Sequence, residues 1–103
     1  MATSKITRDV YDSGWLTLVS GVFYRKIGNV VYVEASNLSS IGSNVTIATL
    51  PSGYRPSKRH TESLSYPINV NGYVNIETSG TIAVINATST TLNNVYFSAT
   101  FVT

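Results

Sequence analysis

The segment from Ser57 to Tyr66 concentrates the side chains of this chain that are most capable of chemistry. It holds the only histidine, two basic residues and one acid, at His60, Lys58, Arg59 and Glu62. In an extended segment Lys58, His60 and Glu62 share one face, because side chains alternate along a strand. Together these side chains offer hydrogen-bond donors, a hydrogen-bond acceptor and positive charge, which suit a saccharide that carries glycerol or phosphate groups. The alternative is a solvated edge strand whose charges discourage pairing with another sheet.

The proline-rich corner ATLPSGYRPSK, from Ala48 to Lys58, is the second candidate site and carries Tyr54 and Arg55 at its tip. Proline fixes its own φ angle and glycine accepts a positive one, so the corner is expected to be stiff. As a binding loop, it would stack the Tyr54 ring on a sugar while Arg55 donates hydrogen bonds. As a structural corner, it would pack Tyr54 over the end of the domain and use Arg55 to hold a carboxylate or carbonyl.

Enzyme chemistry finds little support in the sequence. His60 and Glu62 could form an acid–base pair or half of a metal site, but zinc takes three or four ligands. Glycoside cleavage needs two neighbouring acids, whereas the acids are scattered, at Asp9, Asp12, Glu34, Glu62 and Glu77. Nucleophile-elbow, zinc-helix and phosphate-loop motifs are absent. We therefore expect no catalytic residue, no metal and no cofactor.

Composition points to a single domain with a neutral polar surface. Charged residues make up only 12% of the 103 residues, about half the share of a typical soluble domain. Ser, Thr, Asn and seven tyrosines take their place, which is characteristic of proteins that act outside cells, on sugars or in tight assemblies. A net charge of +2 is by itself too small for a nucleic-acid footprint. No apolar run is long enough for membrane insertion.

The elements that must position these side chains are all strand-like. Eight short alternating runs are bounded by turn signals: Trp15–Ser20, Val22–Ile27, Val30–Ser36, Val45–Leu50, His60–Val70, Tyr73–Thr78, Thr81–Ala87 and Val95–Thr103. Gly28-Asn29 predicts a tight hairpin, and Pro67 reduces the fifth run to an edge strand or partly loop. The pattern predicts an all-β antiparallel sandwich or barrel of jelly-roll type over residues 13–103. Residues 1–12 are expected to form a tail.

The closing strands carry apolar residues on both faces. Ile85 is expected on the outward face of its strand, and Tyr96 and Val102 are expected on the outward face of the last strand. In a small sandwich only one face of each sheet meets the core, so we expect another copy of the chain to cover the second face. Trp15, the only tryptophan, is expected at the same subunit interface, although tryptophan is also a good sugar platform.

Five segments form an ordered series that resembles a known family: DSGWLTL, YRKIGNVVYV, LPSGYRPS, SGTIAV and YFSATF. The series resembles the C-terminal head domains of receptor-binding and tail-fibre proteins of phages that infect Gram-positive bacteria, the lactococcal siphophages among them. The resemblance covers nearly the whole chain, from Asp12 to Thr103. The resemblance implies a non-enzymatic homotrimer at the virion tail tip that binds host cell-wall saccharide and contacts other tail or baseplate proteins. Residues 1–12 would then be either a tail or the end of a fibre neck.

Taken with this resemblance, the sequence predicts a saccharide site drawn from Tyr54, Arg55, Lys58, Arg59, His60, Glu62, Tyr66 and Tyr73. Two other functions stay open. One is a purely structural tip or assembly module without a ligand. The other is an OB-type barrel that binds nucleic acid, because such barrels are small, aromatic and lined with basic residues. Affinity that falls steeply with salt would favour nucleic acid.

Overall fold

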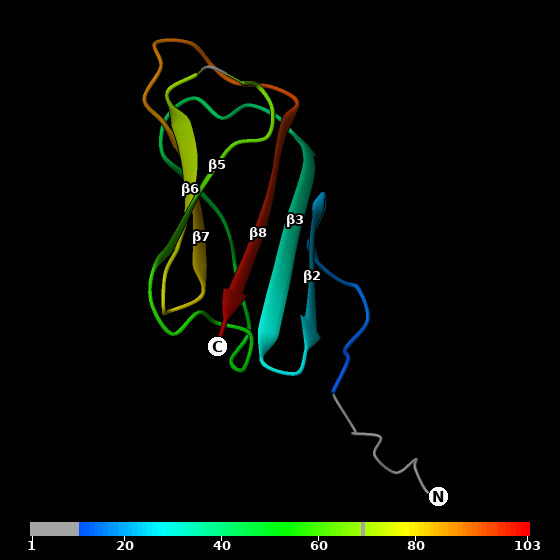
Figure 1. Cartoon of the computed structure of the whole chain (residues 1–103). Coiled ribbons are helices and arrows are strands. Elements are labelled where there is room, and N and C mark those ends of the chain that lie inside the picture. Colours follow the sequence, from blue (N-terminus) through cyan, green and yellow to red (C-terminus); the bar gives the residue numbers. More distant parts are fainter. Residues whose placement is uncertain (1–10, 69) are drawn as a thin grey trace, which may run out of the picture.

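Two antiparallel four-stranded sheets face each other in this computed structural model, which describes residues 11–68 and 70–103 (Figure 1). Most of the predicted tail, residues 1–10, and Asn69 lie outside the described residues. The strands are β1 (Leu16–Val19), β2 (Val22–Ile27), β3 (Val30–Leu38), β4 (Val45–Thr49), β5 (His60–Ser63), β6 (Gly72–Ile76), β7 (Thr81–Asn86) and β8 (Val95–Val102). The predicted all-β sandwich of eight short strands is confirmed.

The order of the strands brings β5 and β8 to the same side of the sandwich. The first sheet has the order β1-β2-β3-β8, and the second has the order β4-β7-β6-β5. The second sheet places β4 beside β7, and this is the strand order of a Greek key. A jelly roll contains two Greek keys. A backbone bridge between Tyr66 and Tyr96 joins the β5 side of one sheet to the β8 edge of the other. We call this junction between β5 and β8 the seam.

Alternation with a period of two fills the space between the sheets. In β8 the residues at alternate positions are buried, from Val95 to Phe101, while Tyr96 and Val102 on the other face are exposed. Ile82 and Val84 of β7 are fully buried in the same core. Burying one such side chain contributes about 1.5–3 kcal/mol relative to leaving it exposed. The inward rows expected for β7 and β8 are therefore confirmed.

Turn chemistry sets where the strands end. Gly28 and Asn29 form the predicted two-residue hairpin, since Ile27 pairs directly with Val30 and Gly28 has a φ of 61°. The fifth predicted run is much shorter than His60–Val70, because β5 ends at Ser63 and the chain continues as a loop through Pro67. The prediction of an edge strand or partial loop is confirmed, since proline cannot donate a ladder hydrogen bond.

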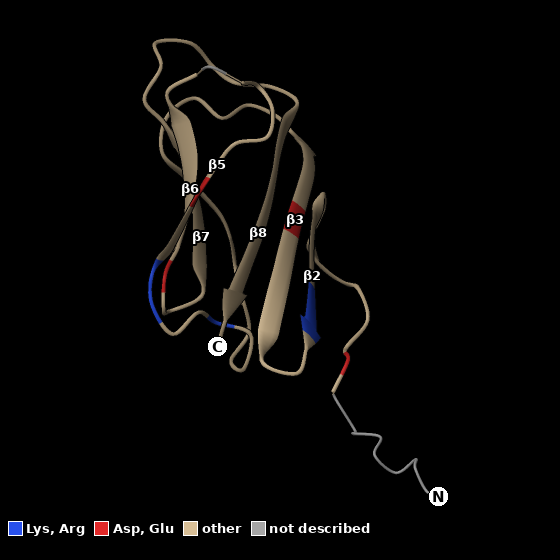
Figure 2. Ribbon diagram, viewed as in Figure 1, with Lys and Arg blue, Asp and Glu red and all other residues tan. Residues whose placement is uncertain are grey.

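The two ends of the sandwich differ in charge. We define the basic end as residues 11–14, 25–29, 51–60, 77–80 and 101–103, and the loop end as residues 36–44, 64–71 without Asn69, and 87–94. All the basic residues that the structure describes lie toward the basic end (Figure 2): Arg25, Lys26, Arg55, Lys58 and Arg59. The loop end contains no charged residue. This division positions the candidate sites.

Candidate functional site

A shallow pocket of about 280 Å³ opens at the basic end of the seam. It is lined by Ser57, Lys58, Arg59, His60, Phe101 and Val102. The backbone N–H of Ser57 donates to the carbonyl of Val102 at 3.1 Å, which ties the start of β5 to the end of β8. The rings of His60 and Phe101 lie 5.8 Å apart between their centroids. The pocket therefore brings together three of the predicted saccharide residues, which are adjacent in the chain.

His60 and Glu62 form a polar pair that faces the seam. His60 lies opposite Ile76 and Glu62 lies opposite Val74 in the β5–β6 ladder, so both side chains point to the core side of the sheet. The Nε2 atom of His60 and the Oε1 atom of Glu62 are 2.7 Å apart. Both side chains keep partial exposure because β5 is an edge strand. The pair can hydrogen-bond a ligand, and it also blunts the edge of the sheet.

The two basic residues of the pocket differ in how far they are engaged. Nε of Arg59 donates to Oε1 of Glu77 at 2.9 Å, and this bond raises the pKa of the Arg59 guanidinium. Its side chain nevertheless remains largely exposed. For Lys58, in contrast, no hydrogen bond or ion pair is found within residues 11–68 and 70–103. Lys58 is therefore the cation most available to a ligand.

Arg55 supports the corner and does not reach the pocket. Its Nε donates to the carbonyl of Leu50 at 2.9 Å. Gly80 packs against this bond with a φ of +89°, and a Cβ at that position would lie 2.6 Å from the Leu50 oxygen and 2.8 Å from Nε of Arg55. The side chain thus fastens the corner to the β6–β7 turn. Arg55 therefore fits the interpretation of the segment as a structural corner, in which its guanidinium holds a carbonyl.

Tyr54 belongs to an aromatic cluster at the basic end, together with Tyr11 and Tyr24. Its ring meets Tyr24 edge to face, with centroids 4.9 Å apart. Its hydroxyl lies 3.0 Å from the hydroxyl of Tyr11, and this hydrogen bond raises the pKa of Tyr54. Nζ of Lys26 sits 5.7 Å from the Tyr54 ring centroid and donates to the carbonyl of Gly53 at 2.6 Å. Tyr54 therefore packs over the end of the domain.

Tyr66 and Tyr73 lie away from the pocket. Tyr66 pairs with Tyr96 at the loop end, where the N–H of Tyr96 donates to the carbonyl of Tyr66 at 2.9 Å. Tyr96 and Val102 are six positions apart along β8, which is roughly 20 Å at about 3.3 Å per residue. Tyr73 lies on the outer face of the second sheet, opposite Ile85. The predicted saccharide residues are thus divided between the pocket, the corner, the loop end and one sheet face.

The expected interface residues lie on both outer faces of the sandwich. Tyr96 and Val102 are 41% and 52% exposed on the first sheet. Trp15 precedes β1 of that sheet, is 48% exposed, and has the Arg25 guanidinium 5.9 Å from its ring centroid. Ile85 lies partly buried on the second sheet. Tyr96 and Val102 are thus exposed within one copy of the chain, whereas Ile85 is partly buried.

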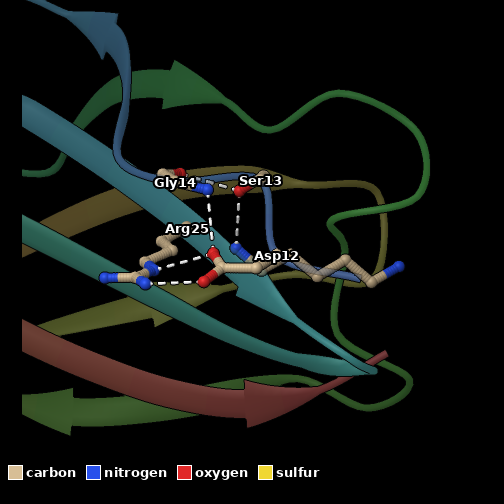
Figure 3. Close-up of polar contacts among 5 residues, drawn as sticks. Asp12, Ser13, Gly14 and Arg25 are labelled. Carbon is tan, nitrogen blue, oxygen red and sulfur yellow. Dashed lines mark hydrogen bonds and ion pairs between the residues drawn. The ribbon is translucent and has the colours of Figure 1, made fainter. Parts of the chain in front are cut away.

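Residues 11–14 lie along β2 and make contacts that we did not expect from the sequence (Figure 3). The Asp12 carboxylate accepts from Nε and Nη2 of Arg25 at 3.0 and 2.7 Å, and from the N–H of Gly14 at 2.9 Å. These bonds, that of Arg25 foremost, lower the pKa of Asp12. The N–H of Ser13 donates to the carbonyl of Lys26 at 2.9 Å. The DSG sequence is a turn signal that could have indicated this docking.

Asn86 is a buried residue that sequence reasoning missed. Its Nδ2 donates to the carbonyls of Ile41 at 2.6 Å and Thr90 at 2.9 Å, while its Oδ1 accepts from the N–H of Thr88 at 2.9 Å. These bonds connect the loops after β3 and β7. The signal was available, because Asn86 continues the inward row of Ile82 and Val84 as a polar residue.

Neither a metal site nor a membrane-spanning helix in the described residues, nor a known family, assigns a function to the chain. Within the described ranges, no three His, Cys, Asp or Glu side chains are grouped so that they could hold a metal ion. No helix there is long and apolar enough to span a membrane. The chain matches no model of a known protein family and no curated protein.

Proposed function

We propose that this chain is a non-enzymatic head domain with which a phage tail attaches to a saccharide on the surface of its host. The resemblance of its ordered segments to phage head domains gives the setting, and the seam pocket gives the site. The observation that carries the site is the convergence of Lys58, Arg59 and His60 beside Phe101 in one pocket. The head would then belong to the tip of the virion tail, in contact with other tail or baseplate proteins.

The pocket offers each kind of group that a charged saccharide needs. Lys58 and Arg59 can donate charge-assisted hydrogen bonds to a phosphate group. Phe101 gives an apolar wall. Glu62 is not part of the lining, but its carboxylate pairs with His60 beside the pocket and can accept hydrogen bonds from hydroxyls. Because the pocket is shallow and open, a single site would bind weakly.

A homotrimer would compensate for weak single sites. Three linked copies raise the effective concentration of ligand at each site, and avidity can exceed single-site affinity by about 10²–10⁴. A closed ring of identical subunits uses two different patches on each copy. Val102 on one sheet and Ile85 on the other supply an exposed and a partly buried residue for two such patches, whereas Tyr96 lies at the loop end. Val102 also lines the pocket, so a neighbouring copy would complete the site.

The test is binding of the protein to purified cell-wall polysaccharide from Gram-positive bacteria, before and after chemical removal of phosphate. Lys58→Gln is expected to weaken binding to the phosphorylated material by about tenfold, which is roughly 1.4 kcal/mol. Lys58→Arg should restore most of the affinity. Thr46→Asp changes the net charge by the same amount at an exposed position of β4, outside both the pocket and the loop end, and should have no effect. Equal affinity of the Lys58→Gln protein and the unchanged protein would refute the assignment of this pocket.

A structural tip or assembly module without a ligand is the second candidate. It is favoured by Tyr54 and Arg55, which occupy the most distinctive corner of the chain yet are engaged within the molecule. A folded oligomer that binds none of the polysaccharides would support it. Nucleic-acid binding is less favoured, because the sandwich has two separate four-stranded sheets, whereas an OB fold is a five-stranded barrel.

A further inference from the structure

The loop end has the composition of a recognition surface. Its three loops consist mainly of Ser, Asn and Thr, with one Tyr, one Gly, eight apolar residues and no charge: SNLSSIGSN at 36–44, LSYPINVN at 64–71 and ATSTTLNN at 87–94. Loops at one end of a sandwich that combine tyrosine with small polar residues are how antibodies build their binding surfaces, since tyrosine supplies contact area and the small polar residues supply hydrogen bonds.

These loops are held in place by the protein itself. The buried Asn86 side chain bonds to the carbonyls of Ile41 and Thr90, and Ile41 and Leu92 exchange two backbone hydrogen bonds of 3.0 Å. The loop at 64–71 is joined to these two where the N–H of Ala87 donates to the carbonyl of Asn71 at 2.8 Å. A surface fixed in this way has less conformational entropy to lose when a ligand binds.

An exposed aromatic pair lies on this neutral end. Tyr66 is 53% exposed and Tyr96 is 41% exposed, and their rings meet at 84° with centroids 6.4 Å apart. Ile68, in the same loop as Tyr66, is 66% exposed. Two tyrosine rings and an isoleucine are therefore presented to solvent without a charged neighbour in the loops.

We infer that the loop end is a second binding surface, distinct from the seam pocket, and that it takes an uncharged oligosaccharide. Tyr66 and Tyr96 would pack against the apolar faces of sugar rings, while loop amides and hydroxyls bond to sugar hydroxyls. A neutral ligand fits because the loops contain no cation to balance an anion, and a buried unpaired charge is costly. The choice of a saccharide rests on the proposed function; the position and neutrality of the surface rest on the loops.

The experiment is an NMR titration of the isotope-labelled full chain with uncharged trisaccharides of N-acetylglucosamine, glucose and galactose. We expect one of them to shift the backbone amides of Tyr66, Thr90 and Tyr96 but not that of Lys58, with a Kd on the order of 1 mM. The affinity should be the same at low and high salt, because no ion pair is formed. Tyr66→Ala should weaken binding by about tenfold and Tyr66→Phe should retain it. Tyr73→Ala, on a sheet face, is the matched control.

The outcomes separate this inference from the proposed function. Shifts confined to Lys58 and His60 would overturn the inference and leave the seam pocket standing. No shift with any of the three sugars would also overturn it, while binding of phosphorylated polysaccharide through Lys58 would still support the proposed function. Loop-end shifts caused by a tail protein but by no sugar would overturn it too, and would assign the surface to a protein partner. If Tyr66→Ala fails to fold, the shifts in the unchanged protein decide the matter.

Discussion

The basic end and the loop end of the sandwich are stabilised by different interactions. At the basic end, Asp12 with Arg25 and Glu77 with Arg59 form ion pairs whose side chains are partly or largely exposed. At the loop end, the neutral side chain of Asn86 is buried and bonds to the backbone of two loops. Exposed ion pairs are screened by salt and contribute little each, whereas a buried amide with several partners is costly to remove. The fold should therefore tolerate the loss of an ion pair at the basic end better than the loss of the buried Asn86 amide at the loop end.

The largest effect is expected from Asn86→Asp. The new carboxylate would face the carbonyl oxygens of Ile41 and Thr90, which now accept from Nδ2, and a buried charge without a partner costs about 3–5 kcal/mol. Urea unfolding at neutral pH measures the loss. Asn44→Asp, in an exposed loop position, should change stability by less than about 0.5 kcal/mol. Similar stabilities for the two variants would show that Asn86 does not organise the loop end.

Gly80→Ala should come next, at the basic end. The left-handed backbone and the close approach of Leu50 and Arg55 together predict a loss of about 2–4 kcal/mol. Gly53→Ala is the matched control, because Gly53 also has a positive φ of +94° but nothing within 4 Å of the added Cβ. It should cost about 1–2 kcal/mol. Equal losses in the two variants would mean that the packing of Arg55 under Gly80 is unimportant.

Arg55→Met should have a smaller effect and distinguishes support from recognition. It removes the bond to the Leu50 carbonyl while keeping an apolar stem, so we expect a loss of about 1–2 kcal/mol. Polysaccharide binding should not change. Lys58→Gln is expected to do the opposite, weakening binding without affecting stability. A tenfold loss of binding in Arg55→Met with unaltered stability would return Arg55 to the binding site.

The smallest effect is expected from Asp12→Asn and depends on pH. The folded protein lowers the pKa of Asp12 below its ordinary value of 3.8 through the bonds from Arg25 and Gly14. The carboxylate therefore stabilises the fold above that value, and this contribution is lost as the pH falls through the lower pKa of the folded state. Thermal unfolding should show the variant slightly less stable at neutral pH, with the curves converging in acid. A constant difference at every pH would exclude this ion pair as the cause.

The sequence predicted the strands better than the sites for a physical reason. Alternation is a local pattern, so β2 was found with its exact bounds and the inward rows of β7 and β8 were identified. The grouping of Lys58, Arg59 and His60 was also predictable because they are neighbours in the chain. The separation of Tyr66 and Tyr73 from that group was not, because it depends on how β5 and β8 are placed by the strand order of two sheets.

Longer-range partners were equally hidden in the sequence. Arg55 has its acceptor five residues away, but the glycine that packs on it, Gly80, comes from the β6–β7 turn. Asn86 bonds to Ile41 across 45 residues. Such contacts follow from tertiary packing, which period and propensity do not encode.

The most direct test of the account is the affinity of the folded protein for phosphorylated cell-wall polysaccharide, measured at low and high salt for Lys58→Gln, Tyr66→Ala and the unchanged chain. We predict that high salt weakens polysaccharide binding by the unchanged chain and that Lys58→Gln removes most of this salt dependence. Tyr66→Ala should lower the affinity by the same factor at both salt concentrations. A folded protein that binds none of this polysaccharide at either salt concentration would contradict the account.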